Sequence, residues 1–289
     1  MTAVTERLQT NRNQLLTVRA MGFVVSPSAP GLLPDPAGLN RPRPGQGSVA
    51  LNVGLGDRAL AWESDHLEPG ASIAHPDPSA NRALQILCCV GNTATVRSGA
   101  AAGDRGIVIG KHGTTLVGFV QRSLARLAPG DAICVDTHGV GLTIDGFADI
   151  HLHSISPHVL EAFVSRQGDA LLLHAVATLP PQLAAAGIGF EARWANIDIE
   201  THHTAALDDR LAALRFGDLV VLAGQDHRYG RQYDPAWSTL GTIVHGASVS
   251  GGHGAGMVSL LTAPSDRLVV QHDAAANLSS LFGKHGAQS

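Results

Sequence analysis

Three short polar turns carry the residues best suited to chemistry in this sequence. They are Asp65-His66-Leu67-Glu68, Gly110-Lys111-His112-Gly113 and Gly252-His253-Gly254. Glycine is a poor neighbour for a histidine that merely packs, but it suits a turn whose backbone N–H groups also face a ligand. We therefore expect the three turns to converge on one small-molecule site.

Histidine is the commonest metal ligand and the usual acid–base group near neutral pH, and the chain has 15 histidines against two lysines. If His66, His112 and His253 meet, they provide three ligands for a divalent metal, with zinc as the first candidate. A fourth position stays open for water, as in catalytic zinc sites. Under this hypothesis Glu68 is the general base, and Lys111 polarises the substrate or holds its carboxylate.

Two alternatives stay open. Without a metal, a His–Glu pair provides acid–base catalysis while Lys111 and glycine N–H groups hold an anionic substrate. In a non-catalytic barrel, the glycine turns only close the structure and the histidines are surface residues of a lysine-poor chain.

Further residues are candidates for the same site. Asp65 adds a second carboxylate beside His66, and Asp226 with His227 occupies a polar turn after an apolar strand. We assign these three to catalysis. The candidate substrate-binding residues are Asn92, Ser98, Gly110, Gly113, Gly252 and Gly254.

Composition limits the possible partners. Charged residues make up 15% of the 289 residues, below the roughly 25% of ordinary soluble domains, so we expect a homo-oligomer. The net charge of −4 and the 4% aromatic content argue against nucleic-acid binding. We expect a small-molecule substrate and no nucleotide cofactor.

The cysteines and the N-terminus indicate a cytoplasmic protein. Cys88, Cys89 and Cys134 form neither a disulfide framework nor a CxxC zinc motif, which fits a reducing compartment. Residues 1–20 lack the apolar core of a signal peptide, and no run of about 18 apolar residues suggests a membrane span.

The elements that must position these residues are mainly short strands. The glycine-rich stretch 84–113 predicts tight turns between strands, and residues 194–199 and 237–245 alternate as strands do. A short helix is predicted over 82–89, capped from residues 79–81, and a second over 204–214.

One pattern occurs twice. Residues 124–131 and 211–218 both read Leu-x-x-Leu-x-x-Gly-Asp and run into an apolar strand. Glycine makes the turn and aspartate bonds its own backbone, so the pattern is structural. It predicts two barrel-like halves, or one barrel with duplicated elements.

Several motifs together resemble a known family over residues 14–262. The motifs are Asp65-His66-Leu67-Glu68-Pro69-Gly70, Cys89-Val90-Gly91-Asn92, Ser98-Gly99, Gly110-Lys111-His112-Gly113, Leu214-Arg215-Phe216-Gly217-Asp218 and Gly252-His253-Gly254-Ala255-Gly256. They are similar to those of a prokaryotic family known only as a domain of unknown function in two parts. The resemblance implies a cyclophilin-like β-barrel and no settled activity. Its members tend to have a second glycine after Gly113, where this chain has Thr114, so the shape of that turn could differ here.

We therefore predict an α+β, mostly β chain with a cyclophilin-like barrel, a second small β-rich part and a few short helices. The expected parts are residues 14–145, residues 146–265 and a peripheral tail, 266–289. The expected function is metal-assisted hydrolysis of a small amide, lactam or ester. The alternatives are a metal-free lyase, isomerase or cyclase acting on a small carboxylate, and a non-catalytic ligand-binding barrel.

Overall fold

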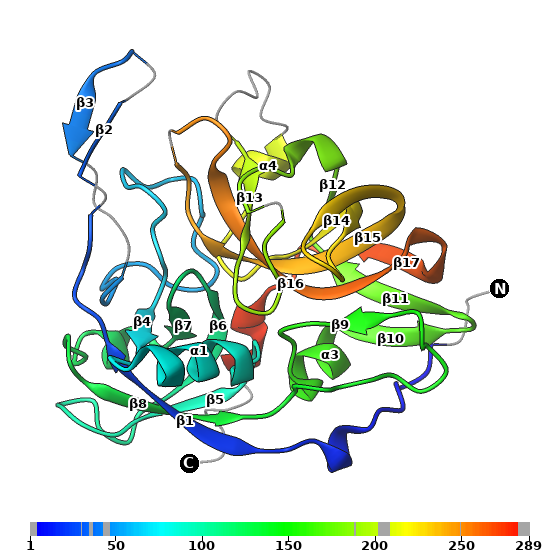
Figure 1. Cartoon of the computed structure of the whole chain (residues 1–289), viewed down its shortest axis with the longest axis horizontal. Coiled ribbons are helices and arrows are strands. Elements are labelled where there is room, and N and C mark those ends of the chain that lie inside the picture. The colour runs from blue at the N-terminus through cyan, green and yellow to red at the C-terminus, as the bar shows by residue number, and fades with distance from the viewer. Residues whose placement is uncertain are drawn as a thin grey trace.

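Strands outnumber helices in this chain, as Figure 1 shows in a computed structural model. The structure describes residues 5–29, 31–34, 37–42, 47–187, 189–201, 209–248 and 250–282. The predicted mostly β fold, with a barrel, a second β-rich part and short helices, is confirmed. The exact limits of the two parts stay a prediction.

The first part is a closed barrel of six antiparallel strands. Around the barrel these are β1 (Val18–Val24), β4 (Ala71–Ala74), β7 (Thr115–Gly118), β6 (Arg105–Lys111), β5 (Thr93–Val96) and β8 (Ala132–Thr137). A small hairpin, β2 (Leu32–Pro34) with β3 (Asn40–Pro42), lies apart from it (Figure 1).

Strand β6 belongs to two cores at once. Val108 packs in the core of the barrel, whereas Ile107 and Ile109 pack in the core of the second part. Both faces of this strand are therefore buried, which explains its almost unbroken apolar run. His112 follows directly after β6 and is positioned by it.

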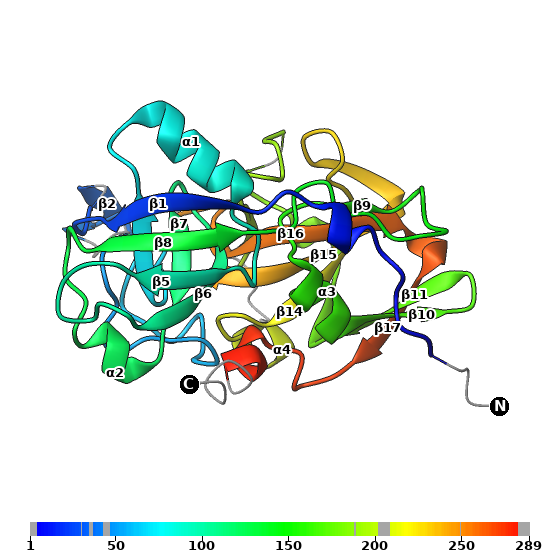
Figure 2. The ribbon, with the colours of Figure 1, turned by 90° about the horizontal axis from the view of Figure 1, so that it is seen from below.

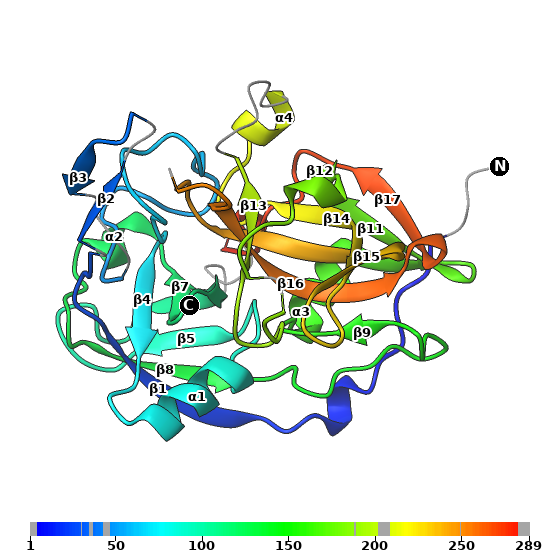
Figure 3. The same cartoon turned by 45° about the horizontal axis from the view of Figure 1, so that its top comes forward.

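The second part contains a six-stranded sheet and a three-stranded sheet (Figure 3). The larger sheet has the order β12 (Ala177–Leu179), β14 (Leu219–Asp226), β15 (Gln232–His245), β16 (Gly254–Pro264) and β13 (Ile197–Glu200), with β9 (His151–Leu152) also paired to β16. The smaller sheet has the order β10 (Val164–Gln167), β11 (Ala170–Ala175) and β17 (Leu268–His272).

The longest helix, α1 (Pro78–Leu87), lies on the outside of the barrel against β1 (Figure 2). The predicted cap within residues 79–81 is wrong, because Asp77 accepts the hydrogen bond from Ala80 N at 2.8 Å. Pro78 then starts the helix, since its missing N–H needs no partner there.

The other helices are short. They are α2 (Gln121–Leu124), α3 (Pro157–Phe163) and α4 (Asp209–Ala212), with 3₁₀ turns η1 (Arg12–Gln14), η2 (Pro181–Leu183), η3 (Ser265–Arg267) and η4 (Leu278–Leu281). Of the helix predicted over 204–214, residues 204–208 lie outside the described residues.

Both Gly-Asp turns have the predicted local structure. Gly130 and Gly217 have φ angles of 93° and 84°, which favour glycine. Asp131 accepts from Ala128 N at 2.9 Å and Asp218 from Arg215 N at 2.8 Å. The first turn leads into β8 of the barrel and the second into β14 of the six-stranded sheet.

The segment after residue 265 is not peripheral, so that prediction is wrong for its described residues. Strand β17 pairs in parallel with β11, and Leu278 and Leu281 are 0% and 1% exposed in the core. Leucines spaced three apart in an Ala- and Ser-rich segment were too few to indicate a core element.

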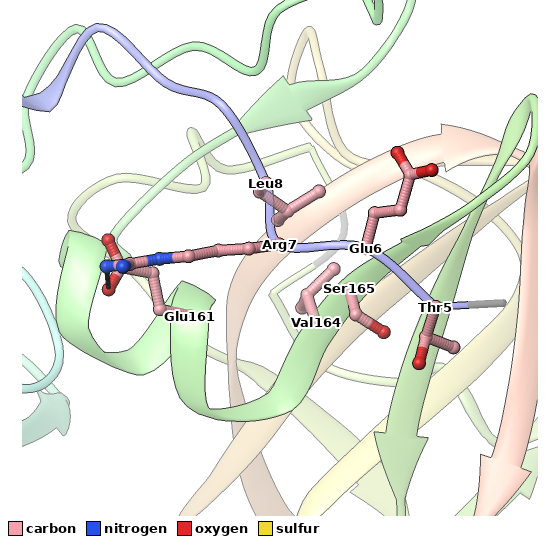
Figure 4. Close-up of a pocket in the computed structure, with 7 residues that line it drawn as sticks. All are labelled: Thr5, Glu6, Arg7, Leu8, Glu161, Val164 and Ser165. Atoms are coloured by element: carbon pink, nitrogen blue, oxygen red, sulfur yellow. Dashed lines mark hydrogen bonds and ion pairs between the residues drawn. The ribbon is translucent and has the colours of Figure 1, made fainter.

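The N-terminal segment lies beside α3 and β10, as Figures 2 and 4 show. Glu6 bridges to Arg166, and Arg7 donates to Glu161 at 2.8 Å. Because this ion pair is largely exposed on the arginine side, we assign it little stabilisation. Within the described residues, no helix has the length and apolar character needed to cross a membrane.

His227, which follows β14, is a fully buried titratable group. Its Nδ1 lies 2.7 Å from Ser259 Oγ. Burial, with Arg231 and His153 nearby, lowers the pKa of His227 to about 2. The ring therefore stays neutral in the folded chain across the physiological pH range.

This burial predicts a loss of stability in mild acid. Below pH 6.5 an unfolded histidine binds a proton that folded His227 does not, so the free energy of unfolding falls by about 1.4 kcal/mol per pH unit for this group. We expect His227→Gln to reduce the pH dependence of the free energy of unfolding between pH 6 and pH 4 by up to that amount, as measured by urea denaturation at several pH values. The exposed His272→Gln is the control, and equal slopes in wild type and His227→Gln would contradict the prediction.

Candidate functional site

A pocket of about 300 Å³ lies where a loop of the barrel part meets the ends of β13, β15 and β16. Its lining combines a polar wall with an apolar one. The lining residues are His66, His112, Ala186, Gly187, Phe190, Ala195, Asn196, Asp198 and His253.

His66 is held rigidly in the loop before β4. Its φ of 50° is uncommon for a residue with a side chain, and its N–H donates to Ala247 O at 2.9 Å. Its Nδ1 lies 2.8 Å from Asp65, whose other oxygen accepts from Ser248 Oγ at 2.7 Å. The ring therefore presents its Nε2 to the pocket.

Asp198 and His253 meet this nitrogen. His66 Nε2 lies 3.4 Å from Asp198 Oδ2 and 3.3 Å from His253 Nδ1, while these last two atoms are 2.8 Å apart. The pairing of Asp198 with Gly256 across β13 and β16 brings the carboxylate to the histidines. Two imidazole nitrogens and a carboxylate oxygen within 4.8 Å of one another are a donor set that zinc accepts.

His245, the last residue of β15, holds Asp198 from the other side and is fully buried. Its Nδ1 donates to Gly246 O at 3.0 Å, and its Nε2 lies 2.8 Å from Asn196 Nδ2 and 3.2 Å from Asp198 Oδ1. Asn196 also donates to Asp198 Oδ1 at 3.0 Å. Burial and the nearby His112 lower the pKa of His245 to about 4.

His112 forms a separate pair with Glu68 on the pocket wall. Its Nδ1 lies 2.7 Å from Glu68 Oε1, and the other carboxylate oxygen accepts from Ser72 Oγ and from Gly47 N, the latter at 3.0 Å. The Glu68 side chain is 1% exposed, so it holds the ring rather than reaching a ligand. The centroids of the His112 and His245 rings are 4.2 Å apart.

The cluster around Asp198 favours positive charge. Burial alone would lower the pKa of His66, but hydrogen bonds to Asp198 and Asp65 raise it to about 9. Burial would raise the pKa of Asp198, whereas its bonds to His245 and His66 hold it well below its usual range. A cation bound to these ligands would take the place of the proton on His66.

The structure brings the three predicted histidines to one pocket, but His112 is not in the ligand cluster, where Asp198 stands in its place beside His66 and His253. Asp65 and Glu68 are beside the histidines, whereas the other predicted catalytic residues lie away from them. Lys111 is 1% exposed and donates from Nζ to Ser154 Oγ at 2.9 Å and to Arg193 O. Burial lowers its pKa. Asp226 is paired with Arg228 at 2.9 Å, and His227 is buried against Ser259. The described lining of the pocket includes none of the predicted residues Lys111, Asp226 and His227.

The six predicted substrate-binding residues also lie outside this lining. Asn92 bonds Cys89 N and His138 O within a turn, and Ser98 accepts from Ala132 N. Gly110 gives Val244 close access to β6, and Gly254 does the same for the backbone of Ile199. Gly113 and Gly252 have φ angles of 69° and 75°, so they make turns.

Asp198, His245 and Asn196 are the residues that sequence reasoning missed. Asp198 had no distinguishing signal, because a charged residue between Ile197 and Ile199 is the ordinary pattern of an alternating strand with one exposed face. His245 ends the strand predicted over 237–245, and Asn196 lies within the strand predicted over 194–199, although the observed β13 begins only at Ile197.

Two family models match successive parts of the chain. The N-terminal model of a domain of unknown function, DUF4438, matches residues 34–161, and its C-terminal model matches residues 163–282. The crystal structure of a protein named TM1086 superposes with a TM-score of 0.90 at 30% identity, covering 95% of this chain and 99% of that one. No curated protein matches the chain.

The site depends on a glycine that faces it. A side chain at Gly256 would overlap His245 Nε2, because the two strands approach closely there. We expect Gly256→Ala to lower the free energy of unfolding by about 1–3 kcal/mol, the usual cost of overpacking. The control is Gly54→Ala, where the added methyl would approach only Gln121 Nε2, at 3.9 Å. Urea denaturation measures both, and equal stability of the two variants would contradict the assignment.

Proposed function

We propose a function for this chain, which belongs to the DUF4438 family: metal-dependent hydrolysis of a small amide, lactam or ester. The observation that carries the proposal is the meeting of His66, Asp198 and His253 on an open pocket. Three protein ligands beside an open pocket are the arrangement of catalytic rather than structural zinc.

The surroundings of the ligands support a metal. Metal-binding histidines usually donate their second ring N–H to a carboxylate or a carbonyl, which fixes the tautomer. His66 has this partner in Asp65, which Ser248 holds in turn. Asp198 is fixed by Asn196, so two of the three ligands have a defined orientation.

The remaining groups fit hydrolysis. When bound, a divalent metal polarises a carbonyl and lowers the pKa of water. His112, held at Nδ1 by Glu68, presents its other ring nitrogen as the acid–base group. In this proposal it takes a proton from the attacking water and returns it to the leaving group, while Glu68 positions the ring. Glu68 is thus a positioning residue and not the general base expected from sequence.

A metal-free reaction on a small carboxylate is less well supported. It needs a cation that faces the ligand. The described lining of the pocket holds no lysine or arginine, and His66, whose pKa is raised to about 9, is already paired with Asp65 and Asp198. The Nζ of Lys111 donates to Ser154 Oγ and Arg193 O instead. Asp65, Glu68 and Asp198 lie around the site, and their charge opposes an anion unless a metal balances it.

A cytoplasmic location and self-association also belong to this proposal. Cys88, Cys89 and Cys134 are free thiols buried in the fold, which suits a reducing compartment. Exposed leucines such as Leu16, Leu32 and Leu51, each at least 60% exposed, would lose contact with water if copies of the chain met there.

Metal content tests the ligand set. After zinc loading and dialysis, we expect close to one zinc per chain in wild type and almost none in folded Asp198→Ala or His253→Ala. Asp65→Asn should weaken zinc affinity roughly 10–100-fold, the usual effect of losing a ligand's carboxylate partner. Elemental analysis and competition with a chelating dye measure this, with His272→Ala as control and circular dichroism to check folding. Wild-type protein that retains no zinc, or an Asp198→Ala variant that retains it, would contradict the assignment of the metal site.

Activity tests the roles of His112 and Glu68. We expect a panel of small amides, lactams and esters to contain a substrate whose hydrolysis stops with a chelator and resumes with zinc. Glu68→Gln should lower kcat by about 10²–10⁴, the usual contribution of acid–base catalysis, with zinc content unchanged. Glu63→Gln, exposed in the same loop, is the matched control. A Glu68→Gln enzyme with normal kcat would remove the pair from the mechanism.

A further inference from the structure

The apolar wall of the pocket is one irregular segment, residues 184–187 and 189–196, here named the strap. It runs from η2 to β13 and contributes Ala186, Gly187, Phe190, Ala195 and Asn196 to the lining. Its start is tied to the sheet, since Ala185 N donates to Asp198 O at 2.9 Å and Ala186 N donates to Gly252 O at 2.9 Å.

Two buried basic side chains fix the rest of the strap. Arg231, 0% exposed, donates from its guanidinium to the carbonyl oxygens of Gly187, Ala195 and Asn196. Lys111 donates to the carbonyl oxygen of Arg193. Burying a guanidinium cation or a polar amino group is costly unless it is hydrogen-bonded, so these contacts hold the strap in one conformation. Because Asn196 also bonds Asp198, the strap and the metal ligands have a fixed relative position.

A rigid strap exposes an aromatic ring next to the polar cluster. Phe190 is 61% exposed although it lines the pocket, and its N–H donates to Gly187 O at 3.2 Å. Ala186 and Ala195 extend the same apolar surface. The charged side chains of the strap, Glu191 and Arg193, pair with each other at 3.4 Å and are absent from the described lining. Covering an exposed phenyl ring with an apolar group of a ligand stabilises the complex, because apolar surface is removed from water.

We propose that Phe190, with Ala186 and Ala195, forms a subsite for an uncharged apolar group of the substrate, up to the size of an aromatic ring. This inference rests on the proposed function, because it places the scissile carbonyl at the His66, Asp198 and His253 cluster. A pocket of about 300 Å³ lies at the small end of ligand sites, so cluster and subsite together accommodate one small molecule. The substrate class is then a small amide, ester or lactam that carries an apolar acyl or ring substituent.

Two hydroxamates that differ only in this group test the subsite. Acetohydroxamate and benzohydroxamate both chelate zinc, and only the second carries a phenyl ring. By titration calorimetry on zinc-loaded protein, we expect benzohydroxamate to bind wild type roughly 10-fold more tightly than acetohydroxamate. Phe190→Ala should reduce this ratio to about 2-fold or less without weakening acetohydroxamate. Trp194→Ala is the matched control, since this ring lies on the same strap outside the described lining, and it should keep the wild-type ratio.

The outcomes separate the two proposals. Equal affinity of wild type for the two hydroxamates, or a ratio that persists in Phe190→Ala, overturns the subsite and leaves the metal site standing. Zinc-loaded wild type that binds neither hydroxamate overturns the proposed function and the subsite with it. A preference that disappears in Phe190→Ala and survives in Trp194→Ala supports the subsite.

Discussion

One buried carboxylate organises the site. Asp198 is 4% exposed and contacts His66 and His253 through one oxygen, and His245 and Asn196 through the other. A charge this far from water is tolerated only when several groups compensate it, so all four partners must be in place. The pairing of β13 with β16, the approach of the loop before β4 and the end of β15 are therefore all constrained by the same residue.

The two parts of the chain form the site through a shared core. Strand β6 faces the barrel core with Val108 and the second core with Ile107 and Ile109. It also delivers His112 to the pocket, while β13 and β16 deliver Asp198 and His253. Neither part contains a complete set of ligands. The burial that joins the parts is thus also what brings the polar groups into contact.

Sequence predicted the fold class and three of the pocket histidines, because alternating strands and glycine-flanked turns are local signals. It did not predict Asp198, since a single acid in an alternating strand reads as one exposed position until the pairing with β16 is known. Lys111 was misleading for a related reason. A lysine at a glycine turn suggests an exposed side chain. Here Lys111 is buried, and its Nζ donates a hydrogen bond to the carbonyl oxygen of Arg193 in the strap. Long-range contacts decided both cases, and one sequence contains no direct record of them.

The order of the ligands along the chain has a consequence for biosynthesis. His66 and His112 are synthesised with the barrel, but Asp198 follows 86 residues after His112 and His253 follows 141 residues after it. Contacts between such distant segments form slowly, because a long loop must close before they are made. The three ligands His66, Asp198 and His253 can therefore meet only after β13 and β16 have been synthesised and have paired. A chain that lacks β16 would have no assembled site, so any cation would be acquired after the second part has folded.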